Sequence, residues 1–163
     1  MEVLESMEKE VILKQVAPCS LMCHTCAAYE EGIICDSARQ LLKYMEGMNE
    51  FLQKHAPIAM DKHKIFEEEL QKYALGKCPG CRNERESACS IDGCYIPECT
   101  KKHNVNFCGE CEEFPCSGIA KVFESEVYHQ WLRGNTEIKN KGLKEFWESN
   151  KERPHYSGYK EEG

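Results

Sequence analysis

The sequence has no excess of basic side chains. Its 163 residues include 21 Lys and Arg against 28 Asp and Glu, which gives a formal net charge of −7. Proteins that bind nucleic acids neutralise phosphates with clustered Lys and Arg. We therefore expect no nucleic-acid partner.

The chain also lacks a secretion signal and a long apolar run. Residues 1–15, MEVLESMEKEVILKQ, are acidic and have neither the basic start nor the apolar stretch of a signal peptide. No apolar stretch approaches the roughly 20 residues that a membrane-spanning helix needs. These absences predict a cytoplasmic protein without membrane association, in a compartment where thiols stay reduced.

Catalytic motifs and strand patterns are equally scarce. The chain contains no Gly-rich phosphate loop, no G-x-S-x-G and no H-E-x-x-H motif. No histidine stands in the context of a general base, although His24 could replace a cysteine as a metal ligand. Alternating β-branched runs are almost absent, so we expect few strands beyond a short hairpin. The absence of catalytic motifs argues against an enzyme. The scarcity of strand patterns predicts a mainly α-helical fold with little β structure.

Apolar residues at helical spacing predict several helices. The expected helices cover residues 2–14, residues 37–55, residues 61–75, a stretch that begins at Ser117 and a stretch that begins at Thr136. Ser37 and Gln40 have the spacing of a capping box. Residues 154–163 are polar and are expected to form a flexible tail. Residues 1–153 are the expected single domain.

Twelve cysteines dominate the sequence, and they are unevenly placed. Eight fall between Cys78 and Cys116, and the others are Cys19, Cys23, Cys26 and Cys35. The large apolar side chains of residues 77–116 are too few to stabilise about 40 residues, a length that usually requires cross-links or metals. In a reducing compartment we expect metal ligands rather than a disulfide framework. The predicted metal lobe spans residues 17–35 and 77–117, with helices around it.

Two C-x-x-C knuckles carry the strongest metal signal, Cys78-Pro-Gly-Cys81 and Cys108-Gly-Glu-Cys111. Two intervening residues let both sulfurs reach one ion, and glycine allows the φ > 0 turn that aims backbone N–H groups at the sulfurs. Redox pairs share this spacing, but no βαβ pattern surrounds either knuckle. The two knuckles together predict one four-cysteine zinc site.

The remaining cysteines can complete two more sites. The second site would use the cysteines that the knuckles leave over in the later stretch, namely Cys89, Cys94, Cys99 and Cys116. Cys89 could instead be a free buried thiol. The third site would use the N-terminal cluster of Cys19, Cys23 and Cys26. Cys35 or a later cysteine would complete it. All twelve cysteines are thus candidate ligands, for about two or three Zn²⁺ ions.

An iron–sulfur cluster is the alternative to zinc. The C-x3-C-x2-C spacing of the N-terminal cluster is also the cluster motif of radical S-adenosylmethionine enzymes. Thr25 stands where those enzymes usually have an aromatic residue, and the chain is shorter than the ~200 residues that their β/α barrel needs. A three-cysteine cluster with an open iron stays open as an alternative, since thiolates suit both metals.

Two parts of the sequence together resemble one family. They are Ala17-Pro18-Cys19-Ser20-Leu21-Met22-Cys23-His24-Thr25-Cys26 and the later run of Cys78-Pro-Gly-Cys81-Arg82, Cys94-x4-Cys99 and Cys108-Gly-Glu-Cys111-Glu-Glu-Phe114-Pro115-Cys116. In this order they resemble the bacterial and archaeal family called domain of unknown function 3795. The resemblance covers about residues 17–120 and implies a small cytosolic protein thought to bind zinc, without an established activity. The family pattern lacks Cys35 and Cys89, and it commonly has glycine where Ser20 stands.

Two hypotheses for the function follow. In the first, zinc holds the cysteine lobe on a small helical scaffold, and the protein is a binding or adaptor module that engages another protein. In the second, an iron–sulfur or thiol-active centre serves electron transfer or a metalloenzyme.

Overall fold

A computed structural model describes residues 2–83, 89 and 91–159 of the chain. Its α-helices are α1 (Glu2–Gln15), α2 (Ile33–Tyr44), α3 (Met48–His55), α4 (Met60–Leu75), α5 (Ile96–Lys102), α6 (Ser125–Lys141) and α7 (Leu143–Asn150). Its 3-10 helices are η1 (Pro57–Ala59), η2 (Cys108–Glu110), η3 (Ser117–Lys121) and η4 (His155–Tyr159). Among the described residues, β structure is limited to two isolated bridges, Val16 with Met22 and Tyr29 with Cys78. The expected fold class, mainly α with little β, is confirmed.

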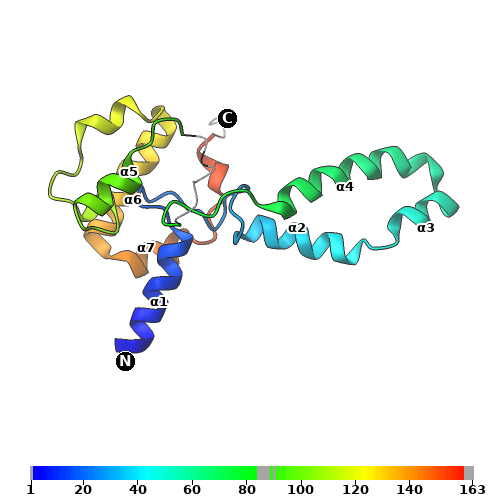
Figure 1. The fold of residues 1–163 in the computed structure, drawn as a ribbon, viewed down its shortest axis with the longest axis horizontal. Coiled ribbons are helices and arrows are strands. Elements are labelled where there is room, and N and C mark those ends of the chain that lie inside the picture. The colour runs from blue at the N-terminus through cyan, green and yellow to red at the C-terminus, as the bar shows by residue number, and fades with distance from the viewer. Residues whose placement is uncertain (1, 84–88, 90, 160–163) are drawn as a thin grey trace.

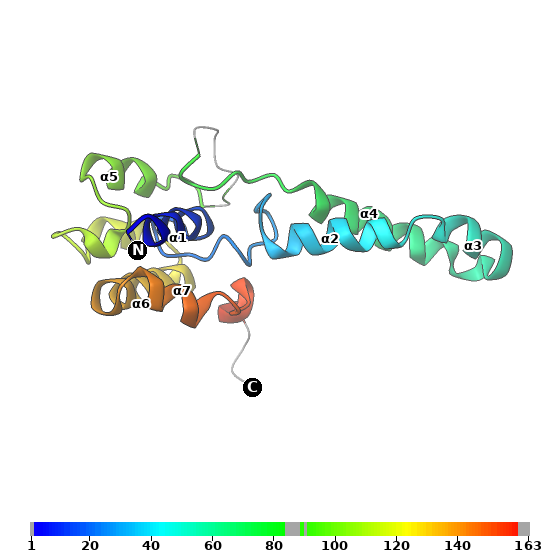
Figure 2. The same ribbon diagram turned by 90° about the horizontal axis from the view of Figure 1, so that it is seen from below.

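The molecule consists of a compact body and a helical hairpin that projects from it (Figure 1). The hairpin contains α2, α3 and α4, and the body contains the other helices and the cysteine loops. The view turned by 90° shows the same separation (Figure 2). Among the described residues, the N–H of Ile33 joins the hairpin to the body by donating to the carbonyl of His24 at 2.8 Å. The segments that flank the hairpin are joined by the Tyr29–Cys78 bridge and by the N–H of Cys78, which donates to the carbonyl of Ala28 at 2.9 Å.

Helix α6 is the centre of the body because two apolar clusters pack on it. The first cluster surrounds the fully buried Trp131, whose ring lies 5.0 Å from that of Phe114 and 6.4 Å from that of Phe123. The second cluster packs Ile138 of α6 against side chains of α1 and α7 and against Phe107. Burying these large side chains supplies the main driving force for folding.

A buried amide in the middle of α6, that of Asn135, joins two cysteine loops. Its Oδ1 accepts the N–H of Gly109 at 2.8 Å, and its Nδ2 donates to the carbonyl of Cys19 at 3.1 Å. Nδ2 also lies 3.0 Å from Ser20 Oγ. A Cβ atom at Gly109 would collide with the backbone of Asn135, so the loop approaches the helix this closely only with glycine.

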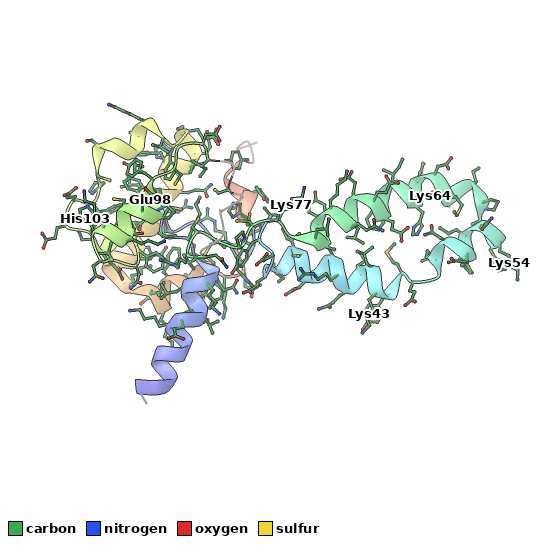
Figure 3. The ribbon with its side chains drawn as sticks, in the orientation of Figure 1. Lys43, Lys54, Lys64, Lys77, Glu98 and His103 are labelled. Carbon is green, nitrogen blue, oxygen red and sulfur yellow. The ribbon has the colours of Figure 1, made fainter. Side chains whose placement is uncertain are left out.

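The hairpin has little core of its own. Ala38 and Cys35 of α2 are buried, whereas α3, η1 and α4 contain no buried side chain. Lys43 and Lys54 point away from the hairpin (Figure 3). Two antiparallel helices can bury one seam between them but leave their outer faces to solvent.

Several helix boundaries differ from the expected ones. The helix expected from Ser37 begins at Ile33, whose N–H donates to the carbonyl of His24 at 2.8 Å, so a tertiary contact replaces the capping box. The single helix expected through residue 55 is two helices, α2 and α3, separated at Gly47, whose φ is +82°. Gly76, with φ +53°, ends α4 as expected.

The helices of the C-terminal half differ more from the expected ones. The segment from Ser117 forms only the 3-10 helix η3, and Thr136, expected to begin a helix, lies inside α6. Gly142, with φ +87°, separates α6 from α7. Helix α5 lies within the predicted metal lobe, where the apolar spacing predicted no helix.

Part of the expected flexible tail is ordered. Residues 155–159 form η4, and His155 Nδ1 lies 2.8 Å from the carbonyl oxygen of Met22. The hydroxyl of Tyr156 accepts the N–H of Ala27 at 3.2 Å. This segment therefore covers the N-terminal cysteine loop. Residues 160–163 lie outside the described part of the chain.

Replacing Asn135 tests its role as the joint between the loops. We expect Asn135→Ala to lower the free energy of unfolding by about 2–4 kcal/mol, because several buried backbone and side-chain groups lose their partner. Denaturant unfolding would measure the loss. Asn140→Ala, at an exposed position of the same helix, should change stability by less than about 0.5 kcal/mol. Equal effects of the two changes would contradict the role of Asn135.

Acidification tests the contact of η4. Burial lowers the pKa of His155, and the carbonyl of Met22 only partly opposes this shift. Its stabilising contribution is therefore complete above the unfolded pKa of about 6.5 and is lost as the pH falls through the lower folded pKa. The melting-temperature advantage of the wild type over His155→Gln should shrink between about pH 7.5 and pH 5. The melting-temperature difference between the wild type and Asn140→Ala, an exposed change on α6 that involves no titratable side chain, should stay constant over this range.

Candidate metal centre

The N-terminal cysteines lie on a tight loop between α1 and α2. The N–H of Ala17 donates to the carbonyl of Leu21 at 2.9 Å, and that of Cys26 donates to the carbonyl of Cys23 at the same distance. Ser20 has φ +66°, a conformation that favours glycine. The loop is thus folded back on itself, with Cys19 buried at its base.

The Cys78-Pro-Gly-Cys81 knuckle lies beside this loop. Gly80 has φ +89°, as the glycine of a metal knuckle would, and a Cβ atom there would lie 3.2 Å from the ring of Tyr29. The bridge between Tyr29 and Cys78 fixes the position of the knuckle relative to Cys26. Segments about 50 residues apart in sequence therefore bring their cysteines together.

The thiols of the N-terminal loop and of the Cys78 knuckle influence one another's pKa values. The pKa of Cys23 is raised well above its usual value, first by burial and then by Cys81, Cys26, Cys78 and Cys89. Adjacent thiolates repel, and a bound cation would relieve that repulsion. The cysteines linked by these electrostatic effects on their pKa values are Cys19, Cys23, Cys26, Cys78, Cys81, Cys89 and Cys94, and we call them the first cysteine group.

A half-buried arginine lies next to the first cysteine group. Arg82 Nε donates to the carbonyl of Leu13 at 2.9 Å, and its NH2 nitrogen donates to that of Asn106 at 2.7 Å. Its guanidinium lies 4.7 Å from the centre of the Phe107 ring. Burial lowers the pKa of Arg82, while the thiols of Cys23, Cys19 and Cys81 oppose that shift. Arg82 thus supplies positive charge beside a group that would become anionic as a metal ligand set.

Four other cysteines line one small cavity of about 30 Å³. They are Cys99, Cys108, Cys111 and Cys116, and we call them the second cysteine group. Helix α5 provides Cys99 and η2 provides Cys108. The N–H of Cys111 donates to the carbonyl of Cys108 at 3.0 Å, which is the tight turn expected for this knuckle.

Trp131 contacts the second cysteine group. Burial raises the pKa of the Cys108 thiol to about 11, whereas hydrogen bonding from the indole of Trp131 lowers it. The indole Nε1 is buried and has no well-aligned acceptor in the described part of the chain. A thiolate at Cys108 would be a better acceptor for this N–H than a thiol, so the indole favours the ligand form of the cysteine.

The structure corrects the expected pairing of the knuckles. Cys108 and Cys111 lie with Cys99 and Cys116, and not with the Cys78 knuckle. Cys94, expected in the second site, belongs with the first group. Cys89 is exposed rather than buried, and its neighbours include Cys94, Cys78 and Cys26.

Cys35 lies apart from both groups. It is fully buried, and its Sγ donates to the carbonyl of Ala74 at 3.3 Å. Burial raises its pKa, and the charged neighbours that also shift it are Arg39, Asp36 and Glu30. Cys35 thus connects α2 to α4 and does not join the other cysteines.

Within residues 2–83, 89 and 91–159, no three His, Cys, Asp or Glu side chains are arranged to hold a metal ion as they stand. Metal ligation therefore stays a prediction. The chemistry of the donors fits a thiophilic metal, because four thiols line one cavity and the indole of Trp131 favours the thiolate form of one of them, Cys108.

Histidines provide few candidate ligands for the two cysteine groups. His24 packs against Trp147, with ring centres 5.3 Å apart, and its Nδ1 lies 3.3 Å from Gln15 Oε1. His103 borders the second group. Sequence reasoning missed Trp131 and Asn135, because no local motif marks a side chain that reaches a cysteine loop from a distant element. Arg82 belongs to the motif that carries the family resemblance, but its contacts with Leu13 and Asn106 were not predicted.

None of the helices in the described part combines the length and the apolar character needed to cross a bilayer.

Comparison with known proteins gives one match. The profile of the family described as "Protein of unknown function (DUF3795)" matches residues 15–121. This range contains all twelve cysteines, eleven in the two cysteine groups and Cys35 as the twelfth. Searches of curated proteins and of solved structures found no match. On the strength of this match over more than half of its length, the chain belongs to the DUF3795 family.

Proposed function

We propose that this protein is a metal-binding module that holds zinc in its cysteine lobe. The observation that carries the proposal is the second cysteine group, in which four thiols from two knuckle-like segments line one cavity. Four thiolates are the ligand set of a structural zinc site. A cytoplasmic location belongs to the same proposal, since thiolate ligands require a reducing compartment.

The proposed role of the metal is structural. Four thiolates complete the tetrahedral shell of zinc and leave no position for a substrate or a reactive water. The segments that carry the second group have few apolar side chains, so ligand bonds would supply stability that their packing does not. A zinc ion there would fix α5 to the loop before η3.

The body with its metal would serve as a support for the projecting hairpin, and the module would engage another protein through it. The Tyr29–Cys78 bridge links the base of the hairpin to the first cysteine group. Large apolar side chains are exposed along the hairpin, among them Tyr44 and Ile58. Exposed apolar surface of this extent is typical of protein interaction sites.

An iron–sulfur cluster in the first cysteine group is the second candidate. In this group seven cysteines influence one another's pKa, and seven is more than the four that one zinc ion uses. Its Cys19, Cys23 and Cys26 also have a spacing that suits a cluster. Visible absorption and acid-labile sulfide in protein purified without oxygen would favour this candidate, and a colourless protein with zinc alone would end it.

Metal content measured on single variants tests the zinc proposal. We expect about two or three zinc ions per chain in the wild type and one fewer in Cys111→Ser, because a tetrahedral site loses affinity when a thiolate is removed. Cys35→Ala is the matched control, since Cys35 contacts Ala74 and neither group. It should keep the full metal content, which elemental analysis would measure.

Removal of the metal tests whether its role is structural. A chelator should lower the melting temperature and reduce the helical circular-dichroism signal of the wild type. Complete metal removal with an unchanged spectrum and melting curve would contradict a structural role.

A further inference from the structure

Four successive backbone N–H groups of the Cys108 knuckle are directed at oxygen atoms. The N–H of Cys108 donates to the carbonyl of Pro18 at 3.1 Å, and that of Gly109 donates to Asn135 Oδ1 at 2.8 Å. The next two N–H groups donate to the carbonyls of Phe107 and Cys108, at 3.1 Å and 3.0 Å. The turn expected from the glycine of this knuckle does not form either, because Gly109 does not have a positive φ. None of these four N–H groups is therefore left for the sulfur of Cys108.

The first cysteine group differs in this respect, because the backbone supplies donors to its sulfurs. Burial raises the pKa of Cys19, and hydrogen bonding from the backbone of Leu21 opposes that shift. Burial likewise raises the pKa of Cys89, and hydrogen bonding from the backbone of Ile91 opposes it. In both cases the donor lies two residues after the cysteine. A metal-bound sulfur at Cys108 would need a donor from another part of the chain.

The indole of Trp131, on helix α6, is such a donor. Its side chain is fully buried in the same apolar cluster as Cys108 and acts on that thiol by hydrogen bonding. Trp131 and Asn135 are four residues apart, so their side chains lie on one face of α6 on successive turns. Asn135 holds the N–H of Gly109, and Trp131 acts on the sulfur of the residue before it. Two adjacent turns of α6 thus hold two adjacent residues of the knuckle.

Three aromatic rings fix the direction of this indole. The ring centre of Trp131 lies 5.0 Å from that of Phe114, 5.4 Å from that of Tyr128 and 6.4 Å from that of Phe123. Phe114 also lines the cavity of the second cysteine group. An indole packed in this way has no room to rotate its N–H towards another acceptor.

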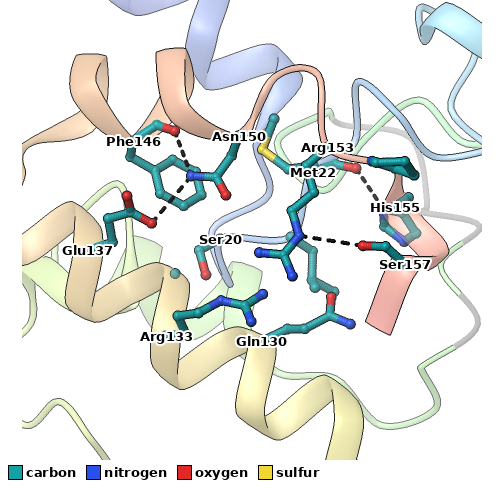
Figure 4. Close-up of a pocket in the computed structure, with 13 residues that line it drawn as sticks. Ser20, Met22, Gln130, Arg133, Glu137, Phe146, Asn150, Arg153, His155 and Ser157 are labelled. Carbon is teal, nitrogen blue, oxygen red and sulfur yellow. Dashed lines mark hydrogen bonds between the residues drawn. The ribbon is translucent and has the colours of Figure 1, made fainter. Parts of the chain in front are cut away.

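Polar side chains do not compete for the indole N–H. Nε1 is buried, and no well-aligned acceptor reaches it in the described part of the chain. A polar cavity of about 40 Å³ on another side of α6 is lined by Gln130, Arg133 and Glu137 (Figure 4). Trp131 does not line this cavity, so its N–H has no access to those groups. A buried N–H beside a thiol, which is a weak acceptor, gains most when the sulfur becomes negatively charged.

We propose that Trp131 is a positioning residue of the metal site, whose indole N–H donates to the metal-bound sulfur of Cys108. It would replace the backbone donors that the knuckle directs to oxygen atoms. This inference rests on the proposed function, because it concerns the metal site that the second cysteine group would form. Groups that hydrogen-bond and orient metal ligands typically change the affinity for the metal by about 10–100-fold.

This hydrogen bond would make the second group a site that retains its metal. A donated N–H stabilises the negative charge of a thiolate and lowers its nucleophilicity. The sulfur of Cys108 would then react more slowly with electrophiles while it stays a ligand. The same helix would thus fix the backbone of the knuckle through Asn135 and the charge of its sulfur through Trp131.

Zinc affinity measured on Trp131→Phe tests the inference. This change removes the N–H and keeps an aromatic ring in the cluster. Competition with a chromogenic chelator should show that one zinc ion, the one that Cys111→Ser loses, binds about tenfold more weakly or worse. The helical circular-dichroism signal of the zinc-loaded protein should stay unchanged. Trp147→Phe makes the same substitution at the other tryptophan, which packs against His24, and should keep the wild-type affinity.

Cobalt substitution provides a readout that a loss of packing alone would not produce. The energy of sulfur-to-cobalt charge transfer depends on the electron density at the sulfur, which a donated N–H reduces. The charge-transfer band of Trp131→Phe should therefore lie at longer wavelength than that of the wild type. The d–d bands, which report the coordination geometry, should not move. Trp147→Phe should match the wild type in both regions, and cobalt should quench the emission of its remaining tryptophan, Trp131.

An isosteric replacement decides the matter if Trp131→Phe does not fold. In the Trp147→Phe protein, biosynthetic incorporation of a benzothiophene analogue of tryptophan exchanges the N–H of the remaining indole for sulfur. The shape of the ring is kept, so packing is preserved while the donor is lost. The same loss of zinc affinity and the same shift of the cobalt band are expected.

Wild-type zinc affinity and an unshifted cobalt band in the folded proteins that lack the N–H would overturn the inference. The metal-binding function would then still stand. If Cys111→Ser instead keeps as much zinc as the wild type, the proposed site itself is refuted, and the role of Trp131 with it.

Discussion

The contacts of Asn135 with two cysteine loops are the constraint on which the body of this protein depends. One amide satisfies the N–H of Gly109 and the carbonyl of Cys19, groups that would otherwise be buried without partners. Because these groups belong to the two different cysteine groups, the central helix sets their relative position. The apolar clusters on the same helix stabilise this arrangement without determining which loop lies where, since apolar packing is not directional.

Much of the helical content was predictable from the sequence, because apolar periodicity reports the face that a helix buries. Helix boundaries were less predictable where tertiary contacts compete with local signals. The capping box at Ser37 lies inside α2, since the carbonyl of His24 satisfies an N–H one turn earlier. Likewise, Thr136 lies in mid-helix because α6 must extend from Trp131 to Ile138 to reach both apolar clusters.

The grouping of the cysteines was beyond sequence reasoning for a different reason. Spacing within a knuckle is local, and the Cys78 and Cys108 knuckles were recognisable from it. Which knuckles meet depends on how the chain returns, and the unanticipated helix α5 carries Cys99 to the later knuckle. The nearest cysteine in sequence is therefore a poor guide to the nearest cysteine in space. Cys35, only nine residues after Cys26, illustrates this, because α2 directs it towards α4.

The position of the hairpin follows from the first cysteine group. Two short connections carry the hairpin, one beginning after Cys26 and the other ending at Cys78, and the bridge at Tyr29 holds them together. Since α3 and α4 bury no side chain, the body contributes little to the direction of the hairpin except through these connections. Any ligand that orders Cys26 and Cys78 would also orient the hairpin. By linkage, a partner that binds one orientation of the hairpin would in turn strengthen ligand binding at the cysteines.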